Sequence, residues 1–108
     1  GMKQRTALAR ALVCRPDMLL MDEPFGSLDA QKREELQGQL LRMWREHQFA
    51  ALFVTHDISE ALFLADRILV LPTAGGPGHT EIKVDLPRPR DRSSSEFRSY
   101  YSRIYSLL

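Results

Sequence analysis

The first half of the chain alternates between short apolar runs and longer stretches in which apolar residues recur every three or four positions. The two apolar runs are residues 18–22 and 50–55, each bounded by polar or turn-forming residues. Runs of this length are typical of buried strands in a parallel sheet. The spacing of apolar residues in 3–14 and 30–47 predicts helices that pack on such a sheet. The pattern therefore indicates an α/β fold.

The second half follows a different pattern. Asp57, with Glu60 three residues later, is typical of the start of a helix. An apolar run at 67–71 predicts a third strand. Residues 80–86 alternate apolar and polar positions, which predicts a strand with one solvent-exposed face. Because the glycine-rich loop 74–78 joins these two strands, we expect them to form an antiparallel pair.

The last residues form a polar stretch followed by an amphipathic segment. We assign residues 1–86 to the α/β portion, residues 87–93 to an extended linker and residues 94–108 to a C-terminal helix. Ser93, three residues before Glu96, provides a helix-start signal. The final helix carries an apolar and aromatic stripe, which we expect either to pack on its own domain or to take part in self-association.

Composition narrows the class of protein. The 108 residues carry a net charge of +1, which argues against nucleic-acid binding driven by bulk charge. No apolar stretch approaches the roughly 20 residues of a membrane span, and no signal peptide precedes the first helix, so we expect a soluble, cytoplasmic protein. The single cysteine, Cys14, lies among apolar helix residues, and we expect a buried structural thiol.

Two adjacent acids end the first apolar run. Asp22 and Glu23 would stand at the carboxyl edge of the sheet, where parallel α/β sheets place their chemistry. Carboxylate oxygens suit Mg²⁺, so Asp22 is a candidate metal ligand. Glu23 is a candidate base for a water molecule that attacks a γ-phosphate. The alternative is that these acids only open a loop before Pro24.

The remaining candidates lie after the second strand and at two helix starts. His56 follows the second apolar run and could reach the same edge, or it could be a solvated or capping residue. Ser27 and Asp29 precede the helix at 30–47, and either could simply cap it. Gly1 comes directly before the first helix, whose free N–H groups would favour an anion.

Together, the order and spacing of these motifs resemble those of the nucleotide-binding subunit of ABC transporters. The similar segments are the end of the signature motif at 1–5, Walker B at 19–24, the D-loop at 27–29 and the switch region at 54–57. The resemblance covers residues 1 to about 72. It implies that Glu23 and His56 are catalytic and that Asp22 binds the metal ion. It also implies nucleotide contacts from the signature and D-loop residues Gly1, Gln4, Ser27 and Asp29.

The resemblance further implies a fold and a setting. The fold would be part of a P-loop NTPase of the RecA-like, ABC ATPase type, with a parallel sheet, flanking helices and a C-terminal antiparallel strand pair. The cofactors would be ATP and Mg²⁺. The partners would be a second ATPase subunit and membrane permease subunits at the inner face of the cell membrane, with no nucleic acid. Residues 85–91 are similar to the importer class for nitrate, sulfonate and taurine, although they also suit a stiff, solvated linker.

One motif of the family's nucleotide site does not occur in these residues. A phosphate loop requires Gly-x-x-x-x-Gly-Lys-Ser/Thr, and none of Lys3, Lys32 and Lys83 follows a glycine. We therefore expect that this chain alone neither binds ATP tightly nor hydrolyses it. We also expect exposed apolar surface on the sheet, and hence a homo-oligomer.

Three functions stay open at this point. The chain could be the C-terminal part of an importer ATPase, or a short non-catalytic protein that pairs with a full subunit or with itself. A DNA-associated ATPase of related fold is disfavoured by the near-neutral charge and by the importer-like region around His56.

Overall fold

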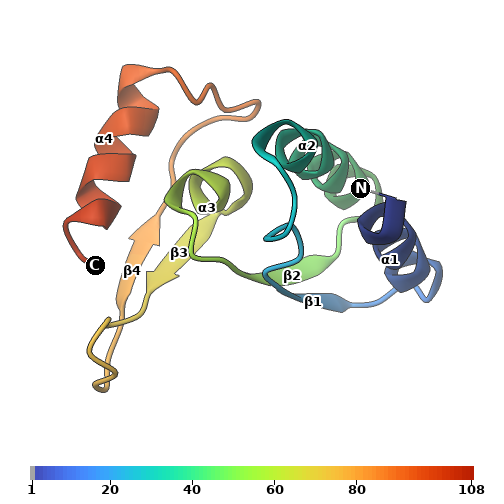
Figure 1. Cartoon of the computed structure of the whole chain (residues 1–108), viewed down its shortest axis with the longest axis horizontal. Coiled ribbons are helices and arrows are strands. Elements are labelled where there is room, and N and C mark those ends of the chain that lie inside the picture. The colour runs from blue at the N-terminus through green and yellow to red at the C-terminus, as the bar shows by residue number, and fades with distance from the viewer. Residues whose placement is uncertain (1) are drawn as a thin grey trace. The chain divides into compact units, whose positions relative to one another are not determined.

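The computed structural model describes residues 2–108, which form two compact units with their boundary between His56 and Asp57. Each unit has its own strand pair and its own helices (Figure 1). One strand pair is parallel and the other, nearer the C-terminus, is antiparallel. The predicted α/β class and the predicted antiparallel pair are therefore confirmed.

The first unit combines two helices with the parallel strands. Its elements are α1 (Met2–Val13), β1 (Met18–Asp22), α2 (Ala30–His47) and β2 (Ala50–Val54). Leu20 lies opposite Leu52, and Asp22 lies opposite Val54. This register places the carboxyl ends of the two strands side by side, so residues that follow β1 and β2 share one edge of the sheet.

The long helix of this unit begins and ends where local chemistry dictates. The side chain of Asp29 accepts a hydrogen bond from the backbone N–H of Lys32 at 2.9 Å, which caps the start of α2. At the other end, Gln48 adopts a left-handed conformation with φ of 47°, and its N–H donates to the carbonyl of Trp44. The predicted bounds of this helix are confirmed.

Residues 2–108 cover only one face of the parallel pair. Leu19 and Met21 of β1 are buried, as are Leu36 and Leu40 of α2, which runs along the strand pair in Figure 1. The opposite face exposes large apolar side chains, and the most exposed of them, Leu20, is 68% exposed. The others are Met18, Leu52 and Val54. Parallel sheets are normally covered on both faces, so an uncovered apolar face is unusual. It confirms the expected exposed apolar surface on the sheet.

The first helix contributes less to the core than its sequence suggests. Leu8 is its buried residue, whereas Val13 is exposed. The thiol of Cys14, just beyond the helix, is also exposed. The expectation of a buried thiol was wrong, because the end of α1 lies outside the packed part of the unit.

The second unit contains a short helix, the antiparallel pair and the C-terminal helix. Its elements are α3 (Ile58–Leu64), β3 (Arg67–Val70), β4 (Thr80–Lys83) and α4 (Ser95–Tyr105). Ile68 lies opposite Ile82. Both strands are shorter than the predicted 67–71 and 80–86. Beyond β4, the carbonyls of Val84 and Leu86 accept hydrogen bonds from an arginine side chain instead of from a strand.

A single apolar cluster holds the second unit together. It consists of Leu62, Ile68, Val70, Ile82, Val84, Phe97 and Ile104. Phe97 and Ile104 belong to α4, so the C-terminal helix packs on its own unit, while Tyr101 and Tyr105 of the same helix are exposed. Within residues 2–108, every helix falls short of the combined length and apolarity that crossing a membrane requires.

The C-terminal helix starts one residue later than predicted. Ser94 is its N-cap, and the Ser94 hydroxyl accepts a hydrogen bond from the N–H of Phe97 at 3.1 Å. The hydroxyl of Ser93 donates to Asp91 Oδ1 at 2.6 Å. The prediction of Ser93 as the cap was wrong because Asp91 engages the first of these serines, which leaves the second to cap the helix.

Two arginines tie the stretch predicted as a linker to the second unit. Arg90 is 6% exposed, and its guanidinium donates to the carbonyls of Leu62 at 2.7 Å and Ala65 at 2.5 Å. Arg88 donates to the carbonyl of Leu64 at 2.6 Å. These carbonyls lie at the end of α3, where cationic donors are favoured. A solvated linker is therefore wrong for Arg90, although the predicted domain boundaries at 86 and 93 stay predictions.

Candidate functional site

Glu23 occupies an unusual backbone conformation directly after β1. Its N–H donates to the carbonyl of Val54 at 2.8 Å, which extends the parallel ladder one residue beyond the strand. Its φ is 44°, in the left-handed region that costs a residue other than glycine about 1–2 kcal/mol. A residue that precedes proline, as Glu23 precedes Pro24, normally adopts an extended conformation. Arg15, which precedes Pro16, and Gln48 adopt a similar φ of 47°, so the conformation marks Glu23 as a candidate only together with its contact to His56.

The carboxylate of Glu23 meets the imidazole of His56. The Nδ1 atom of His56 lies 2.6 Å from Oε1 of Glu23. This distance is typical of a strong hydrogen bond, which Nδ1 donates to the carboxylate in the tautomer that carries the proton on Nδ1. The parallel register accounts for the contact, because it places the residue after β1 beside the residues after β2. The structure therefore brings together the two predicted catalytic residues.

Asp22 ends β1 at the same edge and is exposed. Mg²⁺ commonly takes one or two protein carboxylates and completes its shell with water and substrate phosphates. Among residues 2–108, no group of three or more His, Cys, Asp or Glu side chains could hold a metal ion. A single exposed carboxylate is compatible with a magnesium ion that takes its other ligands from water and phosphates, and the metal-binding role of Asp22 stays a prediction.

Two of the other predicted contact residues, Gln4 and Ser27, meet each other in the first unit. Gln4 Nε2 donates to the hydroxyl of Ser27 at 3.5 Å, a long and weak bond between α1 and the loop after β1. The side chain of Asp29 caps the start of α2, as its position before the predicted helix indicated. Gly1 lies outside the described residues. Whether these residues contact nucleotide stays a prediction.

One functional candidate in this region escaped sequence reasoning. Phe25 has no exposed surface, although it lies in the turn between the acids and α2. Its ring centroid is 5.9 Å from that of Phe53 in β2. The sequence offered one signal for its burial. An aromatic residue stands two positions after Glu23, in a turn that otherwise holds glycine, serine and proline.

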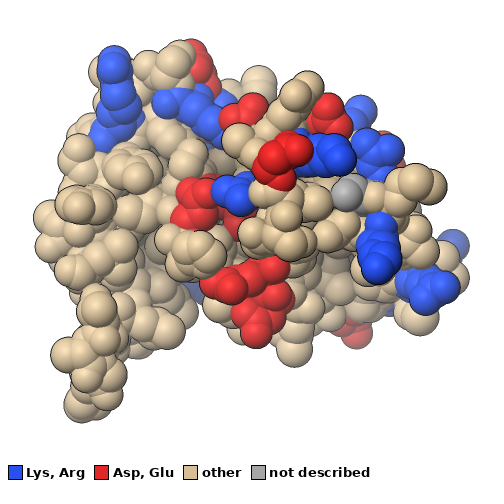
Figure 2. Space-filling model, viewed as in Figure 1, with Lys and Arg blue, Asp and Glu red and all other residues tan. Residues whose placement is uncertain are grey.

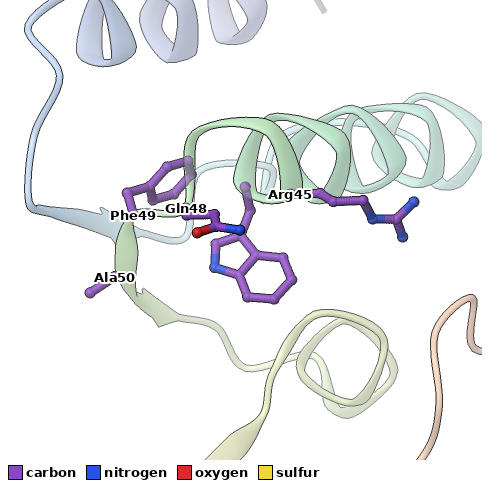
Figure 3. A pocket seen from close by; sticks show the side chains of 5 residues that line it. Arg45, Gln48, Phe49 and Ala50 are labelled. Atoms are coloured by element: carbon purple, nitrogen blue, oxygen red, sulfur yellow. The ribbon is translucent and has the colours of Figure 1, made fainter.

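A hollow of about 370 Å³ lies at the other end of the first unit. It is lined by Trp44, Arg45, Gln48, Phe49 and Ala50 (Figure 3). These residues end α2 and begin β2, whereas His56 follows the end of β2. The hollow is therefore separate from the Glu23–His56 pair, and the candidate chemistry lies at the open carboxyl edge of the strands.

Comparison with known proteins decides the family. A family model described as ABC transporter matches residues 1–26, which include α1, β1 and the two acids. A bicarbonate transport ATP-binding protein, CmpD of Synechococcus elongatus, is 51% identical over 110 residues that cover 99% of this chain and 40% of that protein. The chain belongs to the ABC transporter ATP-binding family.

Two further relatives of the ABC family give the same result. An uncharacterized ABC transporter ATP-binding protein of Methanocaldococcus jannaschii is 47% identical over 108 residues, covering 100% of this chain and 40% of the relative. An aliphatic sulfonates import ATP-binding protein, SsuB of Yersinia pestis, is 52% identical over 96 residues, or 89% of this chain and 35% of the relative. The chain thus spans about 40% of the length of the first of these ABC relatives. The predicted resemblance to ABC transporter ATP-binding subunits is confirmed.

Proposed function

We propose that this chain forms the part of an ABC importer ATPase that carries Walker B, the D-loop and the switch histidine. The 2.6 Å contact between Glu23 and His56 carries the proposal. It couples a carboxylate to an imidazole at the carboxyl edge of parallel strands, where α/β proteins bind ligands. The identity to ABC transporter ATP-binding proteins supports the same assignment.

In this proposal each side chain has a distinct task. Glu23 accepts a proton from the water that attacks the γ-phosphate, and its hydrogen bond to His56 fixes the direction of the carboxylate. Asp22 holds the metal ion, directly or through water. When bound, ATP and Mg²⁺ supply the triphosphate and the positive charge that compensates its oxygens. Gly1, Gln4, Ser27 and Asp29 face nucleotide that a second ATPase subunit holds.

The proposed cargo of the complete importer is a small anion of the nitrate, sulfonate or taurine type. Two relatives support the anion class, because their names refer to bicarbonate and to aliphatic sulfonates. Permease subunits in the membrane and a second ATPase subunit would be the partners. Nucleic acid would not be one, since the net charge is +1 and both charge signs occur on the face shown in Figure 2.

The proposal assigns this chain only part of the nucleotide site. The residues contain no phosphate-loop sequence, so the backbone cradle and lysine for the β- and γ-phosphates must come from elsewhere. The purified 108-residue chain is therefore expected to show no magnesium-dependent ATP turnover. Turnover by the pure chain that disappears in Glu23→Gln would contradict this part of the proposal.

A chimaera tests the catalytic assignment. In it, this chain replaces the residues that it matches in the Synechococcus bicarbonate transport ATP-binding protein. Glu23→Gln should lower the turnover of ATP by about 100-fold or more, because an amide cannot accept the proton, and should still allow ATP-dependent dimers. Glu46→Gln, an exposed carboxylate on α2, is the matched control and should leave turnover unchanged. Equal turnover in the Glu23 variant and the control refutes the assignment.

The exposed apolar face of the β1–β2 pair favours a second candidate, a non-catalytic module that associates with an ATPase subunit or with itself. The sequence of the gene upstream of the Met2 codon separates the two candidates. A phosphate-loop sequence in the same reading frame supports the ATPase, and a start codon at Met2 supports the module.

A further inference from the structure

The left-handed conformation of Glu23 requires a physical cause. In a residue other than glycine such a conformation costs free energy, which contacts with the surrounding structure must offset. Hydrogen bonds explain part of it. The N–H of Glu23 donates to Val54 at 2.8 Å, and its carbonyl accepts from the N–H of Gly26 at 3.2 Å. The second of these bonds is long, and the turn residues Gly26 and Ser27 are exposed, so water can compete for it.

A buried side chain provides the constraint that these bonds lack. Phe25 is 0% exposed, in contrast to Glu23, Gly26 and Ser27 around it. Its ring packs against Phe53 with a centroid separation of 5.9 Å and an interplanar angle of 53°. This arrangement is favourable for two aromatic rings. The turn is therefore anchored to β2 by an apolar side chain two residues beyond Glu23.

The anchor determines where the chain can go between β1 and α2. Asp22 is fixed opposite Val54 by the parallel ladder, and Phe25 is fixed in the core against Phe53. Two residues must join these points, and one of them is Pro24, whose φ is restricted. The remaining freedom lies at Glu23, which takes the left-handed conformation and directs its carboxylate to His56.

We propose that Phe25 is the positioning residue that holds Glu23 in its left-handed conformation and so sets its hydrogen bond to His56. The inference rests on the proposed function for its catalytic meaning, because Phe25 acts through the proposed base and touches no reacting atom. The positional claim, that Phe25 sets the contact between Glu23 and His56, does not depend on any catalytic role. The positional claim and the proposed catalytic function can therefore be tested separately.

The experiment observes the imidazole of His56 by long-range ¹H–¹⁵N spectroscopy of the 108-residue chain at pH 7. Glu23→Gln gives the reference spectrum for an imidazole that has lost its carboxylate partner. Phe25→Ala should shift the His56 ring signals towards that reference, whereas Phe25→Leu, which keeps an apolar anchor, should retain the wild-type signals. Phe49→Ala is the matched control, because Phe49 is a phenylalanine of the same unit, 4% exposed, at the opposite end of β2.

A loss of stability alone would affect the two alanine variants alike, so a shift confined to Phe25→Ala supports positioning. Phe25→Val replaces Phe25→Ala if the latter loses its native amide spectrum. Wild-type ring signals in a folded Phe25→Ala or Phe25→Val variant overturn the inference, as does an equal shift in Phe49→Ala. No ATP turnover enters this measurement. Unchanged turnover in the chimaera with Glu23→Gln would refute the proposed function and leave the positioning result intact.

Discussion

The Nδ1 atom of His56 and the Oε1 atom of Glu23 lie 2.6 Å apart although the two side chains are 80% and 46% exposed. Exposed ion pairs contribute little to folding, because water solvates both partners well when they are apart. The close contact is thus poorly explained as a device for stability. The contrast between short distance and high exposure agrees with the proposal that the contact serves chemistry at the end of the strands.

His56→Ala should therefore separate stability from activity. We expect the free energy of unfolding of the chain to change by less than about 1 kcal/mol, because the contact is solvent exposed. In the chimaera, ATP turnover should fall by about 100-fold, since the proposed base loses the group that orients it. Urea denaturation and an ATPase assay measure the two effects. His79→Ala, at an exposed loop position, should change neither; a large loss of stability in His56→Ala would argue for a structural role instead.

Arg90→Met should destabilise the second unit strongly. The guanidinium of Arg90 donates to the carbonyls of Leu62 and Ala65 at the end of α3 and to that of Leu86 at 3.0 Å. Burial lowers the pKa of Arg90 from its usual value, but these acceptors hold the charged form in place. Its removal leaves buried carbonyls unpaired, which should cost about 3 kcal/mol of unfolding free energy, measured by urea denaturation.

Two further variants make the Arg90 prediction specific. Arg90→Lys should recover little of the loss, because an ammonium cannot reproduce the planar fork of a guanidinium. Arg98→Met, at an exposed position of α4, should be nearly neutral. Equal stability of Arg90→Met and Arg98→Met would show that the hydrogen bonds of the buried guanidinium do not stabilise the second unit.

The order and type of the helices and strands were predictable from the sequence because the signals are local. Apolar runs identified β1 and β2, and Ser27 and Asp29 were the two candidate caps for α2, of which Asp29 is the cap. The meeting of Glu23 and His56 was also foreseeable, since residues that follow neighbouring parallel strands share an edge. These predictions required only periodicity, caps and the geometry of parallel strands.

What escaped prediction depends on contacts between distant residues. Nothing in a Pro-Arg-Pro-Arg sequence shows that Arg90 is buried, because its acceptors are backbone carbonyls, which every residue carries. Ser93 and Ser94 are equally good caps by type, and only the position of Asp91 distinguishes them. The burial of Phe25 likewise depends on Phe53, a residue on another strand.

Asp91 should make the stability of the second unit depend on pH. Hydrogen bonds from the Ser93 hydroxyl and then from the Ser93 N–H lower the pKa of Asp91 from its ordinary value of 3.8. A lowered carboxyl pKa adds stability that is fully present above the unfolded-state value and is lost as the pH falls through the folded-state value. Asp91→Asn should therefore be less stable than wild type at pH 7, and the difference should narrow below pH 3.8.

Thermal or urea unfolding across this pH range provides the measurement for Asp91. Ser93→Ala is the companion variant, because it removes the hydroxyl that contributes most to the shift. It should raise the pKa of Asp91 towards the ordinary value in a carbon-detected NMR titration. A stability difference between wild type and Asp91→Asn that is constant from pH 7 to pH 3 would contradict the assignment.

Self-association should depend on the exposed face of the parallel strand pair. Leu20 is 68% exposed and lies opposite Leu52 on that face, so a second chain could cover both. Leu20→Lys should shift the chain towards monomer in sedimentation equilibrium, because association would bury an unpaired charge. Tyr105→Lys is the matched control at an equally exposed apolar position of α4, and it should leave the association constant unchanged. A monomeric wild-type chain at high concentration would contradict the expected oligomer. If Tyr105→Lys dissociates the oligomer and Leu20→Lys does not, the interface lies on α4 instead.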